Sequence, residues 1–372
     1  MSQSGIYSEN KLVWWYAREQ ELPAAPKQVQ LILSDMCNQD CSFCAYRMSG
    51  YSSNELFMGD SEPSKLGTNN PKRWIPTERA LSLLDEFKEA GVLSVQFTGG
   101  GEPTVHPDHE AIFARALDLG LRCSLVSNGI RWSKNLTENI LPQFDWVRVS
   151  IDAATSDEYV KIRRTHGSHW GIAWGHAHEL ARNINYLETP CTFGLGFVVT
   201  PESWKGIAKF AELAKASGAH NVRYTAMFST DNEKPFTAIY DQVRVLLDKA
   251  KRLSSDTFDV FDNFGSRFDD LQQHAPDYSF CSYQHYTAYV GGDLQLYRCC
   301  VLAYNKRGIV KGGDLTNRSF SEFWASQERK DDFNGLDARN CDRCQFNSKN
   351  RSLLYVMGNT ESDTQPRHLE WP

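Results

Sequence analysis

Short apolar runs alternate with longer amphipathic stretches from about residue 28 to residue 228. Each run is rich in β-branched and aromatic residues, which is typical of buried strands. The six runs are 29–35, 93–98, 121–127, 146–152, 192–200 and 221–228. Between them, 77–91 and 204–219 repeat apolar residues at helical spacing, with Thr77 placed as an N-cap and Gly91 beyond the end. This alternation predicts βαβ units and a parallel sheet.

The predicted core is an α/β fold with too few units for a closed eight-stranded barrel. An open, partial barrel or a doubly wound sheet would fit the pattern. The 372 residues also leave room for a smaller appended module. We expect five parts, namely an N-terminal extension (1–27), the core (28–235), a bridging helix and linker (236–275), a cysteine-containing module (276–350) and a tail (351–372).

Residues 47–75 interrupt the alternation with a stretch rich in Gly, Ser, Asn and Pro, which predicts an ordered insertion or a mobile lid. Aromatic and basic residues in and beside this stretch could line a groove for a nucleobase or a nucleic-acid backbone, although such residues more often form ordinary surface. These residues are Arg47, Tyr51, Lys72, Arg73 and Trp74.

Composition narrows the class of protein. The sequence has no run of about 18 apolar residues, so it predicts no transmembrane helix. The N-terminus also lacks the pattern of a signal peptide, so we expect a cytoplasmic protein without a membrane partner. The net charge of −6 predicts no broad basic surface for nucleic acid, although a local basic groove stays compatible with it. Ten cysteines then favour metal binding or catalysis over disulfides. Cys123 and Cys191 lie alone in apolar runs and are predicted core residues.

The first cysteine group, Cys37, Cys41 and Cys44, directly follows the first predicted strand. Thiolates suit iron–sulfur clusters and zinc, and this spacing can hold three corners of a cubane cluster. A structural zinc site would need a fourth ligand nearby, whereas the next cysteine is Cys123. A second motif, Gly99-Gly100-Gly101-Glu102-Pro103, follows the strand at 93–98. Both motifs lie at carboxyl ends of predicted strands, where barrel active sites lie and where glycine permits close approach.

With these motifs in this order, residues 28–350 resemble the radical S-adenosylmethionine (SAM) superfamily. The resemblance implies a partial (β/α)6 TIM-like barrel and a [4Fe–4S] cluster on the first three cysteines, with its open iron chelated by SAM. It also implies reductive cleavage of SAM to a 5′-deoxyadenosyl radical that abstracts a hydrogen atom. The SAM-binding residues implied by the resemblance are Phe43, Gly100, Gly101, Glu102, Ser127, Asn128, Ser150, Asp152 and either Arg163 or Arg164, with Arg163 preferred.

Several of these residues have a plainer interpretation when taken singly. Ser127-Asn128-Gly129 alone is a turn, and Asp152 alone could cap the following helix. The arginine pair alone would be a solvated helix face. Gly194 and Gly196 could serve tight packing or contact adenine.

The second cysteine group comprises Cys281, Cys299, Cys300, Cys341 and Cys344. Four thiolates would make a closed site for zinc or for a second [4Fe–4S] cluster. The region resembles the short, Twitch form of the SPASM auxiliary-cluster module, which implies an auxiliary cluster on Cys281, Cys299, Cys341 and Cys344. The glycine usual five residues before the second ligand is missing, so Cys300 stays open as an alternative to Cys299. Such a cluster could accept an electron or bind substrate.

The sequence leaves the substrate open. We expect oxidation or rearrangement of an amino-acid-derived or small molecule, as an oxidoreductase or isomerase, with flavodoxin or ferredoxin as electron donor. The alternative is modification or isomerisation of a macromolecular residue, either a peptide side chain or a hypermodified nucleobase. The rival from another class is a structural zinc-binding protein, which would leave the glycine motif unexplained.

Overall fold

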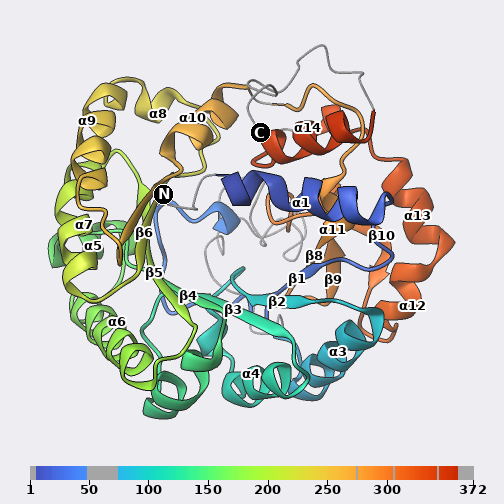
Figure 1. The fold of residues 1–372 in the computed structure, drawn as a ribbon, viewed down its shortest axis with the longest axis horizontal. Coiled ribbons are helices and arrows are strands. Elements are labelled where there is room, and N and C mark those ends of the chain that lie inside the picture. The colour runs from blue at the N-terminus through green and yellow to red at the C-terminus, as the bar shows by residue number, and fades with distance from the viewer. Residues whose placement is uncertain (1–5, 48–73, 274, 305, 342, 359–372) are drawn as a thin grey trace, which may run out of the picture.

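The structure is a computed structural model that describes residues 6–47, 74–273, 275–304, 306–341 and 343–358. Its strands form a curved sheet whose convex side is covered by helices (Figure 1). The order of the described strands across the sheet is β10-β9-β8-β1-β2-β3-β4-β5-β6-β7. Their bounds are β1 Gln28–Leu31, β2 Ser94–Phe97, β3 Arg122–Ser127, β4 Trp146–Ser150, β5 Thr192–Val199, β6 Asn221–Ala226, β7 Asp259–Asp262, β8 Thr287–Val290, β9 Gln295–Tyr297 and β10 Ile309–Asp314.

Every pairing from β8 through β1 to β7 is parallel, and only β8–β9 and β9–β10 are antiparallel. The six predicted strands correspond to β1–β6, so the predicted α/β fold is confirmed as a mostly parallel sheet in an open, barrel-like curve. Strands from the C-terminal part of the chain extend this same sheet, because β8 pairs with β1.

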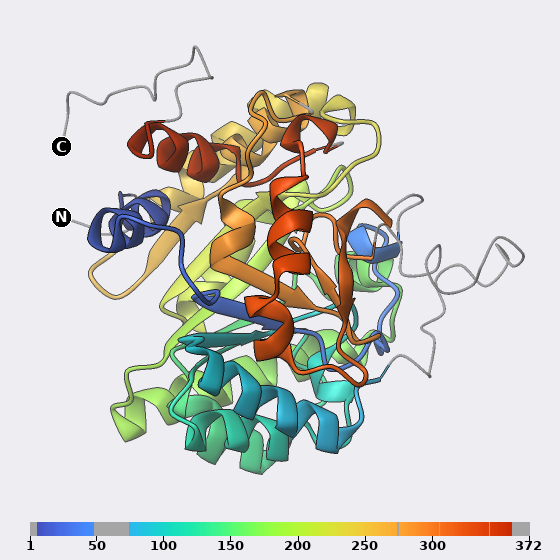
Figure 2. The same cartoon turned by 90° about the vertical axis from the view of Figure 1, so that its right-hand side faces the viewer.

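The helices lie mainly outside the curve, as the turned view in Figure 2 also shows. The described α-helices are α1 Ile6–Glu19, α3 Thr77–Ala90, α4 His109–Asp118, α5 Ser156–Arg163, α6 Ser168–Leu187, α7 Ile207–Ala216, α8 Lys234–Thr237, α9 Tyr240–Lys251, α10 Phe264–Gln273, α11 Tyr283–Tyr286, α12 Phe320–Ala325, α13 Gln327–Asn334 and α14 Asn347–Val356. None of these helices is long and apolar enough to cross a membrane.

The first predicted helix is correct at its end and wrong at its start. Gly91 ends α3 with a left-handed φ of 87°, a conformation that glycine adopts without strain. Thr77 is already helical, and Pro76 holds the cap position. The Thr77 hydroxyl instead donates to the Asp108 carboxylate at 2.5 Å, which ties the start of α3 to the start of α4.

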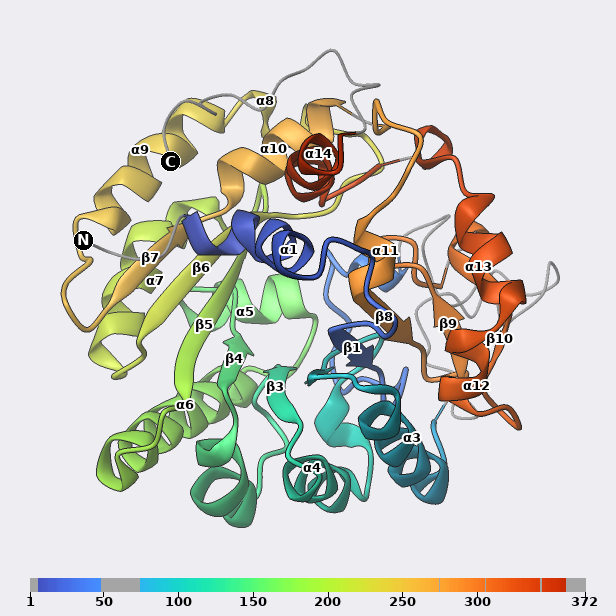
Figure 3. The same ribbon diagram turned by 45° about the vertical axis from the view of Figure 1, so that its right-hand side comes forward.

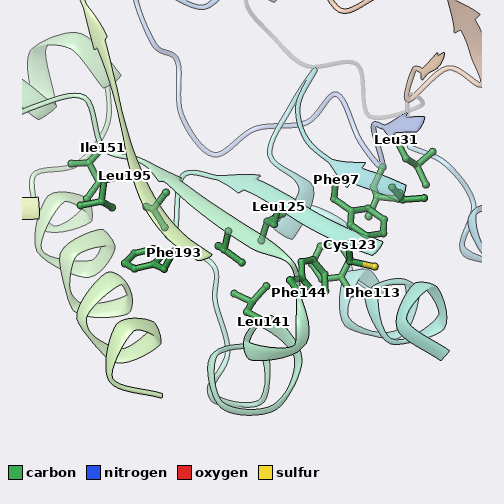
Figure 4. Packing of buried hydrophobic residues seen from close by; sticks show 14 of the residues in the cluster. Leu31, Phe97, Phe113, Cys123, Leu125, Leu141, Phe144, Ile151, Phe193 and Leu195 are labelled. Atoms are coloured by element: carbon green, nitrogen blue, oxygen red, sulfur yellow. The ribbon is translucent and has the colours of Figure 1, made fainter. Parts of the chain in front are cut away.

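The core lies between the convex face of the sheet and its covering helices. Phe97, Phe113 and Phe144 pack together there, with ring centroids 4.5 Å apart for the first pair and 5.6 Å for the last two (Figure 4). Cys123 and Cys191 are each 1% exposed, which confirms both as core residues. Removing one such phenyl ring would cost about 3–5 kcal/mol of stability.

Most of the predicted insertion at 47–75, with Tyr51, Lys72 and Arg73, lies outside the described residues. At its start, Arg47 ends a short helical turn at Ala45–Arg47. At its end, Trp74 is half-buried with its ring 4.9 Å from that of His106. Trp74 is therefore involved in packing where the chain re-enters the barrel.

Candidate functional site

The loop that carries Cys37, Cys41 and Cys44 leaves the carboxyl end of β1 and is fastened to the end of α5. The amide of Ser42 donates to the carbonyl of Ile162 at 2.8 Å, and the amide of Asp40 donates to the carbonyl of Arg163 at 3.2 Å. These backbone hydrogen bonds place the three thiols against the barrel mouth.

The glycine-rich loop after β2 lies directly against this cysteine loop. The amide of Gly101 donates to the carbonyl of Ser34 at 3.0 Å, and the amide of Glu102 donates to that of Met36 at 2.8 Å. A Cβ on Gly101 would lie 2.0 Å from the Met36 carbonyl oxygen, and one on Gly100 would lie 2.2 Å from Asp35 Oδ1. Glycine is therefore required here so that the two loops can touch.

Glu102 is 3% exposed, and both oxygens of its carboxylate accept hydrogen bonds. Oε1 accepts from the Ser127 hydroxyl at 2.7 Å and from the amide and hydroxyl of Thr104 at 3.2 and 2.7 Å. Oε2 accepts from the Asn128 amide at 2.7 Å. This carboxylate thus joins the ends of β2 and β3 in one fixed arrangement.

Ser127-Asn128-Gly129 is both a turn and part of the site. Gly129 has a φ of 72°, and its amide donates to Ser127 Oγ at 3.0 Å. The Asn128 side-chain amide donates to Asn38 Oδ1 at 2.6 Å, inside the cysteine loop. The turn therefore connects β3 to that loop, which the plain turn interpretation alone does not require.

Arg163 and Arg164 differ sharply in position. The side chain of Arg164 is 59% exposed and lies 3.7 Å from Asp40, whereas that of Arg163 is 6% exposed. Arg163 donates to the Asp152 carboxylate, to Gln39 Oε1 at 3.1 Å and to Cys41 Sγ at 3.3 Å. Of the two arginines, Arg163 is thus the buried one, and it contacts a cysteine of the loop, whereas Arg164 contacts the loop only from the exposed side.

Burial opposes both charges of the Arg163–Asp152 pair, and it raises the pKa of the Asp152 carboxyl although Arg163 and the Val198 amide act against this rise. Although burial opposes it, the negative charges of Asp152 and Cys41 raise the pKa of the Arg163 guanidinium above its ordinary value. Its carbon Cζ also lies 5.5 Å from the centroid of the Phe43 ring. Asp152 holds a left-handed φ of 63° and accepts the Val198 amide at 2.6 Å; Thr155, not Asp152, caps α5.

Negative groups converge on the first cysteine group. Burial, then Glu102 and Cys41, with a smaller effect of Cys44, raise the pKa of the Cys37 thiol to about 12. In the described residues, no three His, Cys, Asp or Glu side chains gather as tightly as the ligands of a single metal ion do. Three neighbouring thiols beside a carboxylate fit a larger cationic iron–sulfur core, in which each sulfur binds a different iron.

The second cysteine group is assembled from separate segments. Cys281 precedes α11, Cys299 follows β9, and Cys344 precedes α14. Burial and the neighbouring thiols of Cys300, Cys281 and Cys344 raise the pKa of Cys299. Burial and the neighbouring thiol of Cys281 raise the pKa of Cys344 to about 12.

Cys341 neighbours Cys281 in the second group, whereas Cys300 neighbours Cys299 and also has partners other than thiols. The neighbouring charge of Cys341 helps burial to raise the pKa of Cys281 to about 11. Gln345 Nε2 donates to Cys300 Sγ at 2.8 Å, and the positive charge of Arg267 offsets the effect of burial on the Cys300 pKa. Cys299 is thus better placed than Cys300 to join Cys281, Cys341 and Cys344.

Several residues of this site were not predicted. Gln39 donates to the Tyr159 hydroxyl at 2.6 Å and accepts from Arg163, so it bridges the cysteine loop to α5. Asn38 and Gln39 lie between the predicted ligands Cys37 and Cys41. This position in the sequence was the signal that could have identified them as site residues. Gly196 faces Arg148 Cδ and Ser150 Oγ, which a Cβ would meet at 3.4 and 3.5 Å. These are ordinary van der Waals distances, whereas a Cβ on Gly194 would lie 2.3 Å from Asn221 Oδ1, so the packing interpretation holds for Gly194.

Comparison with known proteins settles the family. The sequence model of the family described as "Radical SAM superfamily" matches residues 31–243 of this chain. This chain belongs to the radical SAM superfamily. It is therefore an enzyme of the SAM-dependent radical type, and the zinc-protein rival is set aside.

Curated radical SAM relatives match part of the chain. A SAM-dependent nucleotide dehydratase of Flammeovirga pacifica is 27% identical over 140 residues, which are 38% of this chain and 43% of the relative. The PqqA peptide cyclase of Granulibacter bethesdensis is 26% identical over 148 residues, 39% of this chain and 37% of the relative. These matches span about half the length of the curated relatives or less.

Solved structures share the radical SAM fold over most of the chain. Streptococcus suis SuiB bound to S-adenosylmethionine superposes with a TM-score of 0.57 at 14% identity, covering 86% of this chain and 69% of SuiB. Native anSMEcpe with bound AdoMet has a TM-score of 0.54 at 14% identity, covering 89% of this chain and all of that protein. The likeness is one of fold.

Proposed function

We propose that this radical SAM enzyme abstracts a hydrogen atom from a residue within a peptide. The observation that carries the proposal is the sequence match to a PqqA peptide cyclase over 148 residues of this chain. The same fold occurs in SuiB bound to its precursor peptide SuiA, with a TM-score of 0.57 over 88% of this chain. These relatives favour the macromolecular alternative over the small-molecule substrate preferred from the sequence.

Cys37, Cys41 and Cys44 would hold the [4Fe–4S] cluster, and Phe43, Gly100, Gly101, Glu102, Ser127, Asn128, Ser150, Asp152 and Arg163 would surround SAM. When bound, the cluster supplies the electron that cleaves SAM, and flavodoxin or ferredoxin would replenish it. The protein's own contribution is positioning. Glu102 is held by four donors, so it can accept from an ammonium group without reorganising.

Arg163 would act as a positioning residue. Its guanidinium is committed to Asp152, Gln39 and Cys41, which fixes the cysteine loop relative to β4 and α5. A buried, charged arginine beside a sulfur ligand also stabilises negative charge on that thiolate.

Cys281, Cys299, Cys341 and Cys344 would hold an auxiliary [4Fe–4S] cluster in a Twitch-like module. The mutual electrostatic effects of these thiols support the assignment. Four protein ligands would leave no iron open, so this cluster would transfer electrons to or from a substrate radical and would not bind substrate.

A nucleotide is the second candidate substrate. Four of the curated relatives are SAM-dependent nucleotide dehydratases, and two are probable GTP 3′,8-cyclases. A peptide substrate and a nucleotide substrate would each stimulate SAM cleavage. The two candidates can therefore be distinguished by testing which class of molecule stimulates it.

The test is anaerobic purification, reconstitution with iron and sulfide, and a 5′-deoxyadenosine assay with SAM and reductant. About eight irons per chain would support two clusters. Host extract is then split into a peptide fraction and a nucleotide fraction, and each is assayed for stimulation. We expect stimulation by peptides, with a mass change in one of them. Stimulation by nucleotides alone would refute the peptide assignment.

A further inference from the structure

Two arginines project from the concave face of the sheet. Val147 and Val149 of β4 are buried in the core on the convex side, so Arg148 between them faces the opposite way. Likewise Val222 and Tyr224 of β6 belong to that core, and Arg223 between them faces the concave side. Both guanidinium groups therefore lie on the side of the sheet that carries the SAM site.

The strand between them is β5 (Figure 3), and it has glycines at the two positions paired with these arginines. Gly194 pairs in register with Arg148, and Gly196 pairs with Arg223. A Cβ on Gly196 would lie 3.4 Å from Arg148 Cδ and 3.5 Å from Ser150 Oγ. The Arg148 side chain thus lies beside the Gly196 backbone, next to the end of β4 where the Ser150 carbonyl accepts from Arg163, whereas the Asn221 side chain covers Gly194.

Arg267 of α10 continues this row of positive charge. Its guanidinium carbon lies 4.8 Å from the ring centroid of Phe228, just beyond β6, and its Nη1 lies 3.8 Å from Oδ2 of Asp270. It also donates to Gln345, whose amide contacts Cys300. The row therefore runs from the candidate SAM site toward the second cysteine group.

These arginines are incompletely satisfied. The Nε atoms of Arg148, Arg223 and Arg267 are buried without a hydrogen-bond partner in the described part of the chain, as is the hydroxyl of Thr225 beside them on β6. No described carboxylate forms an ion pair with Arg148 or Arg223, in contrast to Arg163 with Asp152. A buried unpaired charge is costly, so such a row persists where function supplies an anion.

The pKa values agree with this picture. Burial, with the neighbouring charge of Arg223, lowers the pKa of Arg148 to about 9. Burial and the charge of Arg267 lower the pKa of Arg223 as well. Burial and the repulsion between neighbouring guanidinium groups both disfavour their charged forms, and an oxyanion between them would offset both effects.

We infer that Arg148, Arg223 and Arg267 bind an oxyanion of the substrate, a carboxylate or a phosphate, near Gly196 of β5 and beside the proposed SAM site. The inference rests on the proposed function in that the anion is carried by the molecule that loses the hydrogen atom. Guanidinium groups bind both oxyanions through paired N–H donors, so the two sources share one chemistry.

The first test needs no turnover. We would compare the thermal stability of the holoenzyme with those of Arg148→Gln, Arg223→Gln and the exposed control Arg182→Gln, in buffer without oxyanions. Removing an unpaired buried charge should raise the melting temperature of the first two variants and leave the control unchanged. A lower melting temperature in both would mean that these arginines are structural, and would overturn the inference.

The second test measures binding with defined probes, namely inorganic pyrophosphate, the acidic peptide acetyl-Glu-Glu-amide and its neutral analogue acetyl-Gln-Gln-amide. One of the two anions should bind the wild-type holoenzyme at least about tenfold more tightly than Arg148→Gln or Arg223→Gln. Preference for the acidic peptide identifies a carboxylate, and preference for pyrophosphate identifies a phosphate. Equal binding of all three probes, or equal binding by wild type and variants, would overturn the inference.

This outcome is separable from that of the proposed function. Anion binding lost in the variants, together with stimulation by nucleotides only, would keep the arginine site and discard the peptide. Stimulation by a peptide with unchanged kinetics in Arg223→Gln would keep the peptide and discard the site. Arg223→Lys is the conservative variant, and it should recover part of the binding because a point charge remains.

Discussion

The two cysteine groups of this protein are built in opposite ways. The first is one continuous loop after β1, fastened by backbone hydrogen bonds to the glycine-rich loop and to α5. The second gathers cysteines from three stretches of chain, and side chains join them. Tyr278 connects to Asn347 and Asn350 at 3.1 Å each, and Asn350 accepts from the Ser282 hydroxyl at 2.8 Å.

The difference teaches which contacts each group depends on. Spacing along the chain suffices to bring three thiols of a short loop together, since the loop closes over few residues. The second group exists only after β9, α11 and α14 have packed, so it depends on tertiary structure. The first should therefore tolerate disturbance of the second better than the reverse.

The largest effect is expected from Cys41→Ala. This change removes a thiol that contacts Arg163 in the first group, and 5′-deoxyadenosine formation should fall to background. The control is Cys123→Ala, which alters a buried cysteine of the core and should retain iron and activity. Substantial SAM cleavage by Cys41→Ala would contradict the assignment of the first group.

Cys344→Ala tests the asymmetry between the groups. Iron content should drop from about eight to about four per chain, while SAM cleavage stays within about tenfold and product formation stops. Cys300→Ala should keep both clusters, because Cys300 faces Gln345 and Arg267 while Cys299 faces the other thiols. Loss of four irons in Cys300→Ala but not in Cys299→Ala would reverse that choice. Full turnover by Cys344→Ala would make the auxiliary cluster dispensable.

Gly101→Ala tests the contact between the two loops of the first region. Because its Cβ would collide with the Met36 carbonyl, the free energy of unfolding should fall by at least about 2 kcal/mol in chemical denaturation. The matched control is Gly175→Ala in α6, where a Cβ meets nothing within 4 Å. That variant should gain about 0.5–1 kcal/mol from helix propensity. Equal effects of the two changes would sink the close-contact explanation.

The last effect, which is confined to acidic pH, is a pH dependence belonging to the second region. Burial, with the charge of Arg329, lowers the pKa of His285 from 6.5 to about 4, and its ring stacks 5.5 Å from Phe280. Between these values the unfolded chain binds the proton and the folded one does not, so stability falls as pH decreases. The loss should reach about 2–3 kcal/mol at pH 4. Urea unfolding of His285→Asn should show a flatter pH profile, unlike the exposed His166→Asn.

Much of the barrel could be predicted from the sequence. The strands β1–β6 are buried on at least one face and carry apolar runs that mark them, but β7 reads DVFD and is half-buried throughout. The strand β8 is fully buried yet only four residues long, and it was expected inside a separate module. Its place beside β1 is a long-range pairing that leaves no periodic signal in the sequence.

The candidate site divides in the same manner. The cysteine and glycine motifs are local, so the residue pattern sufficed to find them. Arg148 and Arg223 were missed because each looks like an ordinary polar position of an alternating strand. Only the pairing of β4, β5 and β6 reveals that the two arginines share the concave face of the sheet, with the glycines of β5 between them.

The parallel pairing of β8 with β1 has a consequence for biosynthesis. Gln28 pairs with Thr287, so β1 is made long before its neighbour. At typical ribosomal speeds the delay is about 10–50 seconds. During that interval one edge of β1 has unsatisfied backbone donors and acceptors, and such an edge can form β-sheet hydrogen bonds with other chains. The nascent protein should therefore depend on chaperones until its C-terminal quarter emerges, and truncation before β8 should yield aggregates and no smaller stable barrel.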